Sequence, residues 1–120
     1  LSAHGTYAIQ AGIAAAHSEG ASDWALVAEL YTRLAEVEPS PVVELNRAVA
    51  VAMADGPEAG LVALERIEGL DGYYLFHSAR ADFLRRLGRP AADAYARAIE
   101  LAPSEVERDF LRTRLSETQR

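Results

Sequence analysis

The sequence contains no cysteine and no lysine, and these two absences exclude whole classes of site. Without cysteine there is no disulfide and no thiolate zinc site, so the redox compartment is left open. All twelve basic residues are arginine, against eighteen carboxylates, and the formal net charge is −6. Because a phosphate backbone is bound by a clustered basic surface, we expect no direct nucleic-acid binding by this chain.

Long apolar runs are also missing. No run approaches the roughly 20 residues that a membrane span needs, and no signal-peptide pattern is recognisable at the start. We therefore expect a cytoplasmic location and no membrane partner. The chain begins at Leu1 without an initiator methionine, so we expect it to be a piece of a longer protein.

Motifs that carry catalytic or metal chemistry are absent from the sequence as well. The three histidines, His4, His17 and His77, do not have the spacing of metal ligands. No glycine-rich phosphate loop and no nucleophile motif occurs. The sequence therefore predicts a protein that is not an enzyme and that holds no metal or cofactor.

Alanine is abundant, at 24 positions, and half of all residues are hydrophobic. This composition favours close-packed helices. Prolines, glycines and N-cap residues divide the chain into about seven expected helices and no strands. These helices are expected near residues 3–18, 22–37, 41–54, 57–67, 73–87, 90–101 and 104–118. We expect an all-α fold in a single domain over residues 1–120.

One spacing of residues occurs twice in the chain. The pattern of Tyr31, Leu34 and Pro39 recurs 64 residues later, within "AADAYARAIELAP" at residues 91–103. That segment resembles the second half of a tetratricopeptide repeat. A helical hairpin of this kind cannot bury its own apolar face and stacks on its neighbour. We therefore expect tandem antiparallel hairpins in a right-handed, tetratricopeptide-like solenoid, with an irregular helical bundle as the alternative.

The periodicity also predicts which side chains are buried. For the helix at 41–54, the inward residues are expected to be Val42, Leu45, Val49 and Met53, with Ala48 and Ala52 allowing close approach of a neighbour. Asn46 and Ala50 are expected on an adjoining face. For the last helix, the expected buried residues are Val106, Phe110 and Leu111.

A polar cluster of Glu44, Asn46 and Arg47 interrupts the apolar sequence of the helix at 41–54. In a tetratricopeptide array the first helix of each hairpin lines a concave groove, where the Asn46 amide would bind a peptide backbone. Alternatively, Asn46 bonds a neighbouring loop or helix end and keeps the hairpins in register. Arg47 has an expected surface partner in Glu44, three residues earlier.

A second candidate set lies on the helix at 73–87. Ser78, Asp82 and Arg85 follow one polar stripe, which with Asn46 would form a mixed-charge groove for a protein segment; a solvated face explains the same stripe. The remaining candidates are Tyr73 and His77. An apolar pocket near these two residues and Phe76 would suit a different function, the sensing of a small ligand.

Four segments carry a resemblance to a known family: "QAGIAAAH" at 10–17, "DWALVAELYTRL" at 23–34, "SPVVELNRAVAVAMADGPEAGL" at 40–61 and "ARADFLRRLGR" at 79–89. They resemble the C-terminal, tetratricopeptide-like extension of one group of extracytoplasmic-function (ECF) RNA polymerase sigma factors, of the sigma-70 family. The resemblance covers nearly the whole chain, and the two sigma domains of that family lie upstream and are not part of it.

The resemblance implies a bacterial, non-catalytic domain that regulates transcription initiation. Its expected partners are the sigma domains of the same polypeptide, RNA polymerase through the full-length protein, or another regulatory protein. The alternatives are a small-ligand sensing helical domain and a stand-alone tetratricopeptide scaffold. The sign of regulation and the target promoter do not follow from the sequence.

Overall fold

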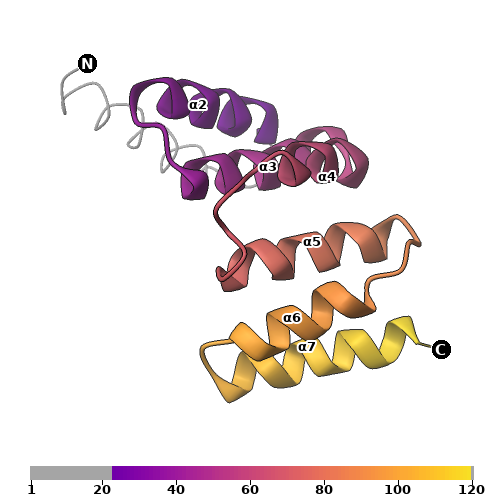
Figure 1. Cartoon of the computed structure of the whole chain (residues 1–120). Helices are drawn as coiled ribbons and strands as arrows, with labels where there is room; N and C mark the ends of the chain where they lie inside the picture. Colours follow the sequence, from indigo (N-terminus) through magenta and orange to yellow (C-terminus); the bar gives the residue numbers. More distant parts are fainter. Residues whose placement is uncertain (1–22, 120) are drawn as a thin grey trace. The chain divides into compact units, whose positions relative to one another are not determined.

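The structure, a computed structural model, describes residues 23–119, and all regular secondary structure within them is helical (Figure 1). The helices are α2 (Trp24–Val37), α3 (Pro41–Asp55), α4 (Pro57–Glu65), α5 (Tyr74–Arg86), α6 (Ala92–Leu101) and α7 (Glu105–Thr118). The prediction of an all-α fold is confirmed for this part of the chain. The helix expected at 3–18, with His4 and His17, lies outside the described residues.

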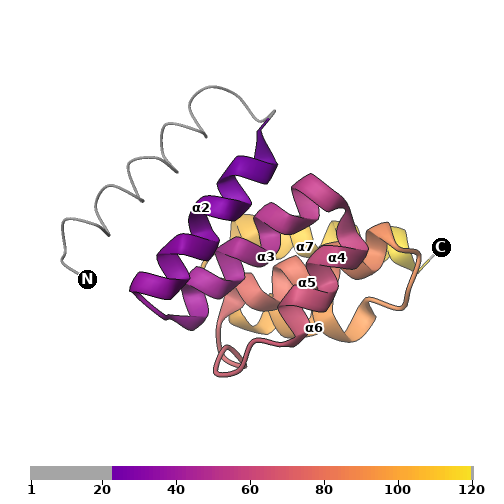
Figure 2. The same ribbon diagram turned by 90° about the horizontal axis from the view of Figure 1, so that it is seen from above.

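The chain divides into two compact units, the first ending at Ile67 and the second beginning at Glu68. In the first unit α3 packs against both α2 and α4, and in the second α6 packs against both α5 and α7 (Figures 1 and 2). The connections within each unit are short, so sequential helices are neighbours. The prediction of one domain over residues 1–120 stays a prediction.

Local signals start the helices. Pro41 occupies the first position of α3, and the Ser40 hydroxyl accepts a hydrogen bond from the Val42 amide at 3.2 Å. The Ser104 hydroxyl likewise accepts from the Glu107 amide of α7, at 3.4 Å. These bonds satisfy amides that have no partner inside a helix, so each start is encoded by a few adjacent residues.

The end of α5 explains why α6 begins at Ala92, two residues later than expected. Gly88 has φ +68°, and its amide donates to the Arg85 carbonyl at 3.0 Å. The Arg89 amide donates to the Leu84 carbonyl at 2.9 Å. This pair of bonds is a Schellman motif, which occupies the chain through Arg89 and leaves no room for a helix start at residue 90.

The first unit is held together by small residues on one side of α3 and larger ones on the other. Gly60 of α4 lies so close to α3 that a Cβ at this position would be 2.3 Å from the Ala52 Cβ. On the side of α2, Ala50 is buried in a cluster with Val27 and Leu34. Alanine and glycine therefore let two helices, α2 and α4, approach the central α3 closely.

The second unit has its buried residues mainly on α5 and α6. They are Leu70, Ala81, Phe83, Leu84, Ala91, Ala94, Tyr95, Ala98, Ala102 and Leu111. Leu111 is the one α7 residue among them. Most of α7 is therefore exposed, which matters for the surfaces described below.

Candidate functional site

Helix α3 is covered by α2 on one side and by α4 on another. The side of α3 that neither helix covers is exposed. Along it lie Val42, Asn46 and Met53, at i, i+4 and i+11, and we call these three residues the α3 stripe. Val42 is 37% exposed and Met53 is 45% exposed. The α3 stripe is thus an apolar surface with one amide side chain near its middle.

The prediction that Val42 and Met53 point inward is wrong. The prediction is confirmed for Leu45, Ala48 and Ala52, which are buried, and Ala50, which was expected on an adjoining face, is buried too. The reason is that α3 packs against α4 through the side of Ala52 and against α2 through the side of Ala50, and Val42 and Met53 lie between these two sides.

Arg47 connects α3 to α2. Its Nε donates to the Thr32 hydroxyl at 2.9 Å, and this hydroxyl donates in turn to the Ala28 carbonyl, also at 2.9 Å. The predicted surface ion pair between Glu44 and Arg47 is wrong, because the Arg47 side chain points to α2 instead. Glu44 lies in the first turn of α3, where the positive end of the helix dipole stabilises its negative charge.

Asn46 does not take part in this link. Its side chain is exposed and makes no hydrogen bond to any residue within 23–119. Among the described residues, the hydrogen bond that aligns α2 with α3 therefore comes from Arg47. The amide donors and acceptor of Asn46 remain available on the α3 stripe.

The polar stripe of α5 is engaged within its own unit. The Asp82 carboxylate accepts from Arg85 Nη2 at 2.7 Å and lies 3.0 Å from Arg86 Nε. Arg85 also interacts with the hydroxyl of Tyr95 on α6. The hydrogen bond that Arg85 donates to Asp82 raises the pKa of the Arg85 guanidinium, and the loss of hydration on burial opposes this effect. Asp82 is consequently already neutralised by two arginines.

The hydroxyls of Tyr95 and Tyr74, in the same unit, have raised pKa values. Burial raises the pKa of Tyr95, and the hydrogen bond from Arg85 offsets part of the effect. Burial also raises the pKa of Tyr74, helped by the charge of Glu107 and opposed by a hydrogen bond with Ser78. Ser78 therefore lies next to Tyr74 of its own helix and interacts with its hydroxyl.

His77 and Tyr73 lie beside the turn that precedes α5. His77 Nε2 is 2.7 Å from the Asp71 carbonyl, which also accepts from Arg97 Nη2 at 3.3 Å. The His77 ring meets that of Phe76 edge to face, with centroids 5.1 Å apart. His77 thus holds the turn at residues 68–73, and Tyr73, half-buried, is the N-cap residue that precedes α5.

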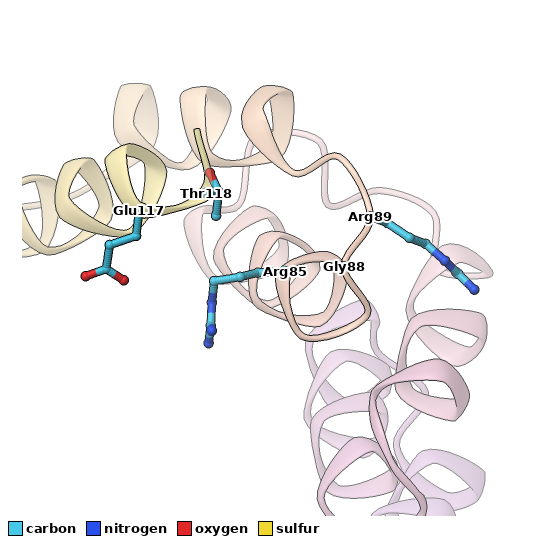
Figure 3. Close-up of a pocket in the computed structure, with 5 residues that line it drawn as sticks. All are labelled: Arg85, Gly88, Arg89, Glu117 and Thr118. Carbon is cyan, nitrogen blue, oxygen red and sulfur yellow. The ribbon is translucent and has the colours of Figure 1, made fainter. Parts of the chain in front are cut away.

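An open hollow lies at the C-terminal ends of α5 and α7 (Figure 3). Its volume is about 300 Å³, and its lining residues are Arg85, Gly88, Arg89, Glu117 and Thr118. In the close-up the Arg89 side chain points away from Glu117. Of these residues the sequence predicted only Arg85, because a hollow between two helix ends depends on how the helices meet.

A second exposed surface lies on α7. Val106 is 80% exposed and Phe110 is 57% exposed, whereas the sequence predicted that both are buried with Leu111. That prediction is wrong for these two residues, because Leu111 alone faces the unit's interior and the positions of Val106 and Phe110 lie on another side of the helix. We call Val106 and Phe110 the α7 stripe.

The eight candidate residues are thus divided between the units. The first unit holds Glu44, Asn46 and Arg47, and the second holds Tyr73, His77, Ser78, Asp82 and Arg85. Within the described part of the chain, no group of three or more acidic or histidine side chains is placed to hold a metal ion. None of the helices from Trp24 to Thr118 is both long and apolar enough to cross a membrane.

No protein-family model matches the chain, and no solved structure matches it. The chain is 44% identical over 118 residues to an uncharacterised protein of Rhizobium meliloti (strain 1021). The match covers 92% of this chain and 28% of that protein, so the chain spans little more than a quarter of its relative's length. The similarity connects this sequence to a much longer protein that has no assigned activity.

Proposed function

We propose that this chain is a non-catalytic protein-interaction domain, the regulatory extension of an ECF RNA polymerase sigma factor. The proposal rests on the resemblance of four segments to that family and on the helical fold of residues 23–119. On this proposal the domain works in the bacterial cytoplasm, together with the sigma domains and RNA polymerase. It modulates transcription initiation by contact with the sigma domains or with another regulatory protein.

We further propose that the helices form tetratricopeptide-like hairpins in a right-handed solenoid. Three of the four positions of the repeat pattern at residues 91–103, namely Ala91, Tyr95 and Ala98, are buried, as packing positions of a repeat should be. The fourth, Pro103, follows the end of α6 at Leu101. These features support stacked hairpins and agree with the role that each position has in such repeats.

The α3 stripe is the observation that carries the interaction proposal. An extended peptide offers backbone amides and carbonyls in alternation, and the Asn46 side chain donates to one and accepts from the other. Val42 and Met53 would bury apolar side chains of the peptide on either side, and the flexible Met53 side chain adapts to their shape. Because Arg47 already aligns α2 with α3, Asn46 is not needed for that alignment.

The contact need not be strong when both parts belong to one polypeptide. A short flexible connection gives a tethered partner an effective concentration on the order of millimolar. A dissociation constant of about 1 mM in separate molecules would therefore still leave a substantial bound fraction in the full-length protein.

The test is an NMR titration of the isotope-labelled 120-residue chain with separately purified sigma domains. We expect amide shifts that concentrate on α3 around Asn46 and that weaken in Asn46→Ala. The matched control is Arg47→Ala, the neighbouring residue, which should lower stability but leave the shifts at Val42 and Met53 in place.

Two results would contradict parts of the proposal. No shift at about 1 mM sigma domains would remove direct contact with the sigma domains and leave another regulatory protein as partner. Equal loss of thermal stability in Asn46→Ala and Arg47→Ala would assign Asn46 a structural role and remove the α3 stripe as a binding surface.

A further inference from the structure

The chain contains a single sulfur atom, and this atom lies on the α3 stripe. There is no cysteine, and Met53 is the one methionine in the sequence. Thiols and thioethers are the side-chain groups that peroxides oxidise most readily. Because no thiol competes for the oxidant, mild oxidation of this chain is directed to one position.

Met53 is accessible to a small oxidant. Its side chain is 45% exposed, and it lies two residues before the end of α3 at Asp55. The two residues that follow it, Ala54 and Asp55, are exposed as well. The preceding residue, Ala52, faces α4 at Gly60 and is buried. An oxidant can therefore reach the Met53 sulfur while α3 stays packed in its unit.

We propose that Met53 is a redox-sensitive modification site, at which oxidation to methionine sulfoxide weakens the binding of the sigma domains to the α3 stripe. The inference rests on the proposed function, because it concerns the same surface. The oxidant is hydrogen peroxide. The Met53 sulfur attacks one peroxide oxygen, the O–O bond breaks as the S–O bond forms, and the second oxygen leaves as water. The sulfur loses two electrons, and the peroxide gains them.

This modification changes the α3 stripe where an apolar contact is expected. The thioether is a flexible, apolar group that adapts to the shape of a partner. The sulfoxide carries a polar oxygen, which loses its bound water when a partner covers it. Val42 and Asn46, the other residues of the α3 stripe, are not changed. We therefore expect oxidation to raise the dissociation constant about tenfold and not to abolish binding.

Oxidation of Met53 should leave the fold intact. Methionine sulfoxide disrupts a protein when it forms inside a core. The buried residues of α3 are Leu45, Ala48, Ala50 and Ala52, and Met53 is not among them. We expect the oxidised chain to keep the helical content and the thermal unfolding midpoint of the reduced chain. Methionine sulfoxide reductases would then restore the original side chain.

The test compares three forms of the isotope-labelled 120-residue chain by NMR: reduced, oxidised with hydrogen peroxide, and oxidised and then treated with methionine sulfoxide reductases. The peroxide is removed before the purified sigma domains are added, so that only this chain is modified. Mass spectrometry verifies that one oxygen atom has been added at Met53. The amide shifts around Asn46 should require about tenfold more sigma domains in the oxidised form and should recover after reduction.

Two substitutions of Met53 serve as matched variants. Met53→Leu keeps an apolar side chain without sulfur, so its binding of the sigma domains, whatever its strength, should not respond to peroxide. Met53→Gln places a polar amide in a side chain of similar length and should bind as weakly as the oxidised chain without treatment.

Three results would overturn the inference: equal binding by the reduced and oxidised chains, unfolding on oxidation, or a response of Met53→Leu to peroxide as large as that of the wild type. Absence of amide shifts with the reduced chain would instead contradict direct contact with the sigma domains, and this inference would fall with that contact. The reduced chain thus tests the proposed function, and the oxidised chain tests the role of Met53.

Discussion

At the scale of single residues, the closest contact in the first unit involves Gly60. A glycine inside a helix normally weakens it relative to alanine, by roughly 1 kcal/mol. Here α4 lies against the Ala52 backbone and side chain of α3, and there is no space for a Cβ at position 60. Tight packing of two helices therefore takes precedence over helix propensity at this position.

Gly60→Ala tests this conclusion. The added Cβ would lie 2.3 Å from the Ala52 Cβ and 2.9 Å from its Cα, so the helices must separate. We expect a loss of about 1 to 3 kcal/mol in the free energy of unfolding, measured by urea denaturation. Gly72→Ala is the control, because nothing lies within 4 Å of a Cβ there and φ is not positive. Equal stabilities of the two variants would contradict the close approach.

Burial and nearby charges both change the pKa of the Tyr95 hydroxyl. Its pKa in the folded protein is raised above the ordinary value of 10.0, mainly by burial. The unfolded chain therefore loses the Tyr95 proton at a lower pH than the folded protein does. Titration of Tyr95 therefore leaves the free energy of unfolding unchanged below about pH 10 and lowers it as the pH rises through the folded pKa.

Tyr95→Phe removes this titration. We expect a stability about 1 kcal/mol lower near neutral pH, because the interaction of the Tyr95 hydroxyl with Arg85 is lost. Above about pH 10 the variant should lose less stability per pH unit than the wild type, so the two curves approach each other. Tyr31 and Tyr74 also have raised pKa values and titrate in both proteins. Parallel curves in chemical denaturation from pH 8 to about 11 would exclude this role of Tyr95.

At the scale of the helices, the link between α2 and α3 is a chain of two hydrogen bonds. Arg47 donates to Thr32, and Thr32 donates to the Ala28 carbonyl. Apolar contacts such as those of Val27 and Ala50 hold the two helices together but allow them to slide. A directional bond from a half-buried charged side chain fixes their alignment along the axis.

A double-mutant cycle measures this link. Thr32→Val keeps the side-chain shape but removes the hydroxyl, and Arg47→Ala removes the donor. We expect each variant to lose about 1 kcal/mol in the free energy of unfolding, with a coupling energy of about 0.5 to 1.5 kcal/mol. Additive losses would mean that the bond contributes nothing to stability. Thr113→Val is a control, because the Thr113 hydroxyl donates to the Asp109 carbonyl of its own helix and so does not link two helices.

The end of α5 depends on one glycine. Gly88 has φ +68°, a conformation that alanine adopts only with strain. Gly88→Ala should therefore lower the free energy of unfolding by about 1 kcal/mol. Gly88→Asn should cost less, because asparagine tolerates this conformation. Thermal unfolding of the two variants gives the comparison, and a more stable alanine variant would be inconsistent with the Schellman motif.

At the scale of the whole molecule, the chain separates into two compact units at residues 67 and 68. The segment between α4 and α5 is exposed at Glu68, Gly69, Asp71 and Gly72, whereas Leu70 is buried. Exposed segments between compact units are the usual sites of proteolytic cleavage. We therefore expect the segment between the two compact units to be cleaved by proteases before the helices are.

Limited proteolysis checks this inference. Within residues 23–119, a glutamate-specific protease should cleave first after Glu68. Glu36, also exposed but inside α2, should be cut later because the helix must open before it fits a protease. Mass spectrometry of early time points identifies the cut. A first cut after Glu36 would contradict the division at residues 67 and 68.

The sequence predicted the fold class and much of the local structure because both depend on neighbouring residues. Ser40 with Pro41, and Ser104 with Glu107, start helices through bonds that span at most three residues. Gly88 ends α5 in the same local way. Such signals can be recognised without knowing what the helix packs against.

The candidate site was less predictable because it depends on which side of each helix is covered. Glu44 and Arg47 have the spacing of an ion pair, but Arg47 bonds Thr32, which is 15 residues away in the sequence. Val106 and Phe110 have the spacing of a buried face, yet both are exposed. Periodicity gives the sides of a helix but does not say which neighbour covers each one.

The sequence by itself determined that residues 23–119 form helices, since alanine content, caps and breakers act within one or two turns. Tertiary structure alone decided that α3 is covered on two sides, by α2 and α4, and exposed along Val42, Asn46 and Met53. It also decided that Leu111 is the buried residue of α7. The physical reason is that burial is a property of contacts between helices, and these contacts are not recorded in the period of any one of them.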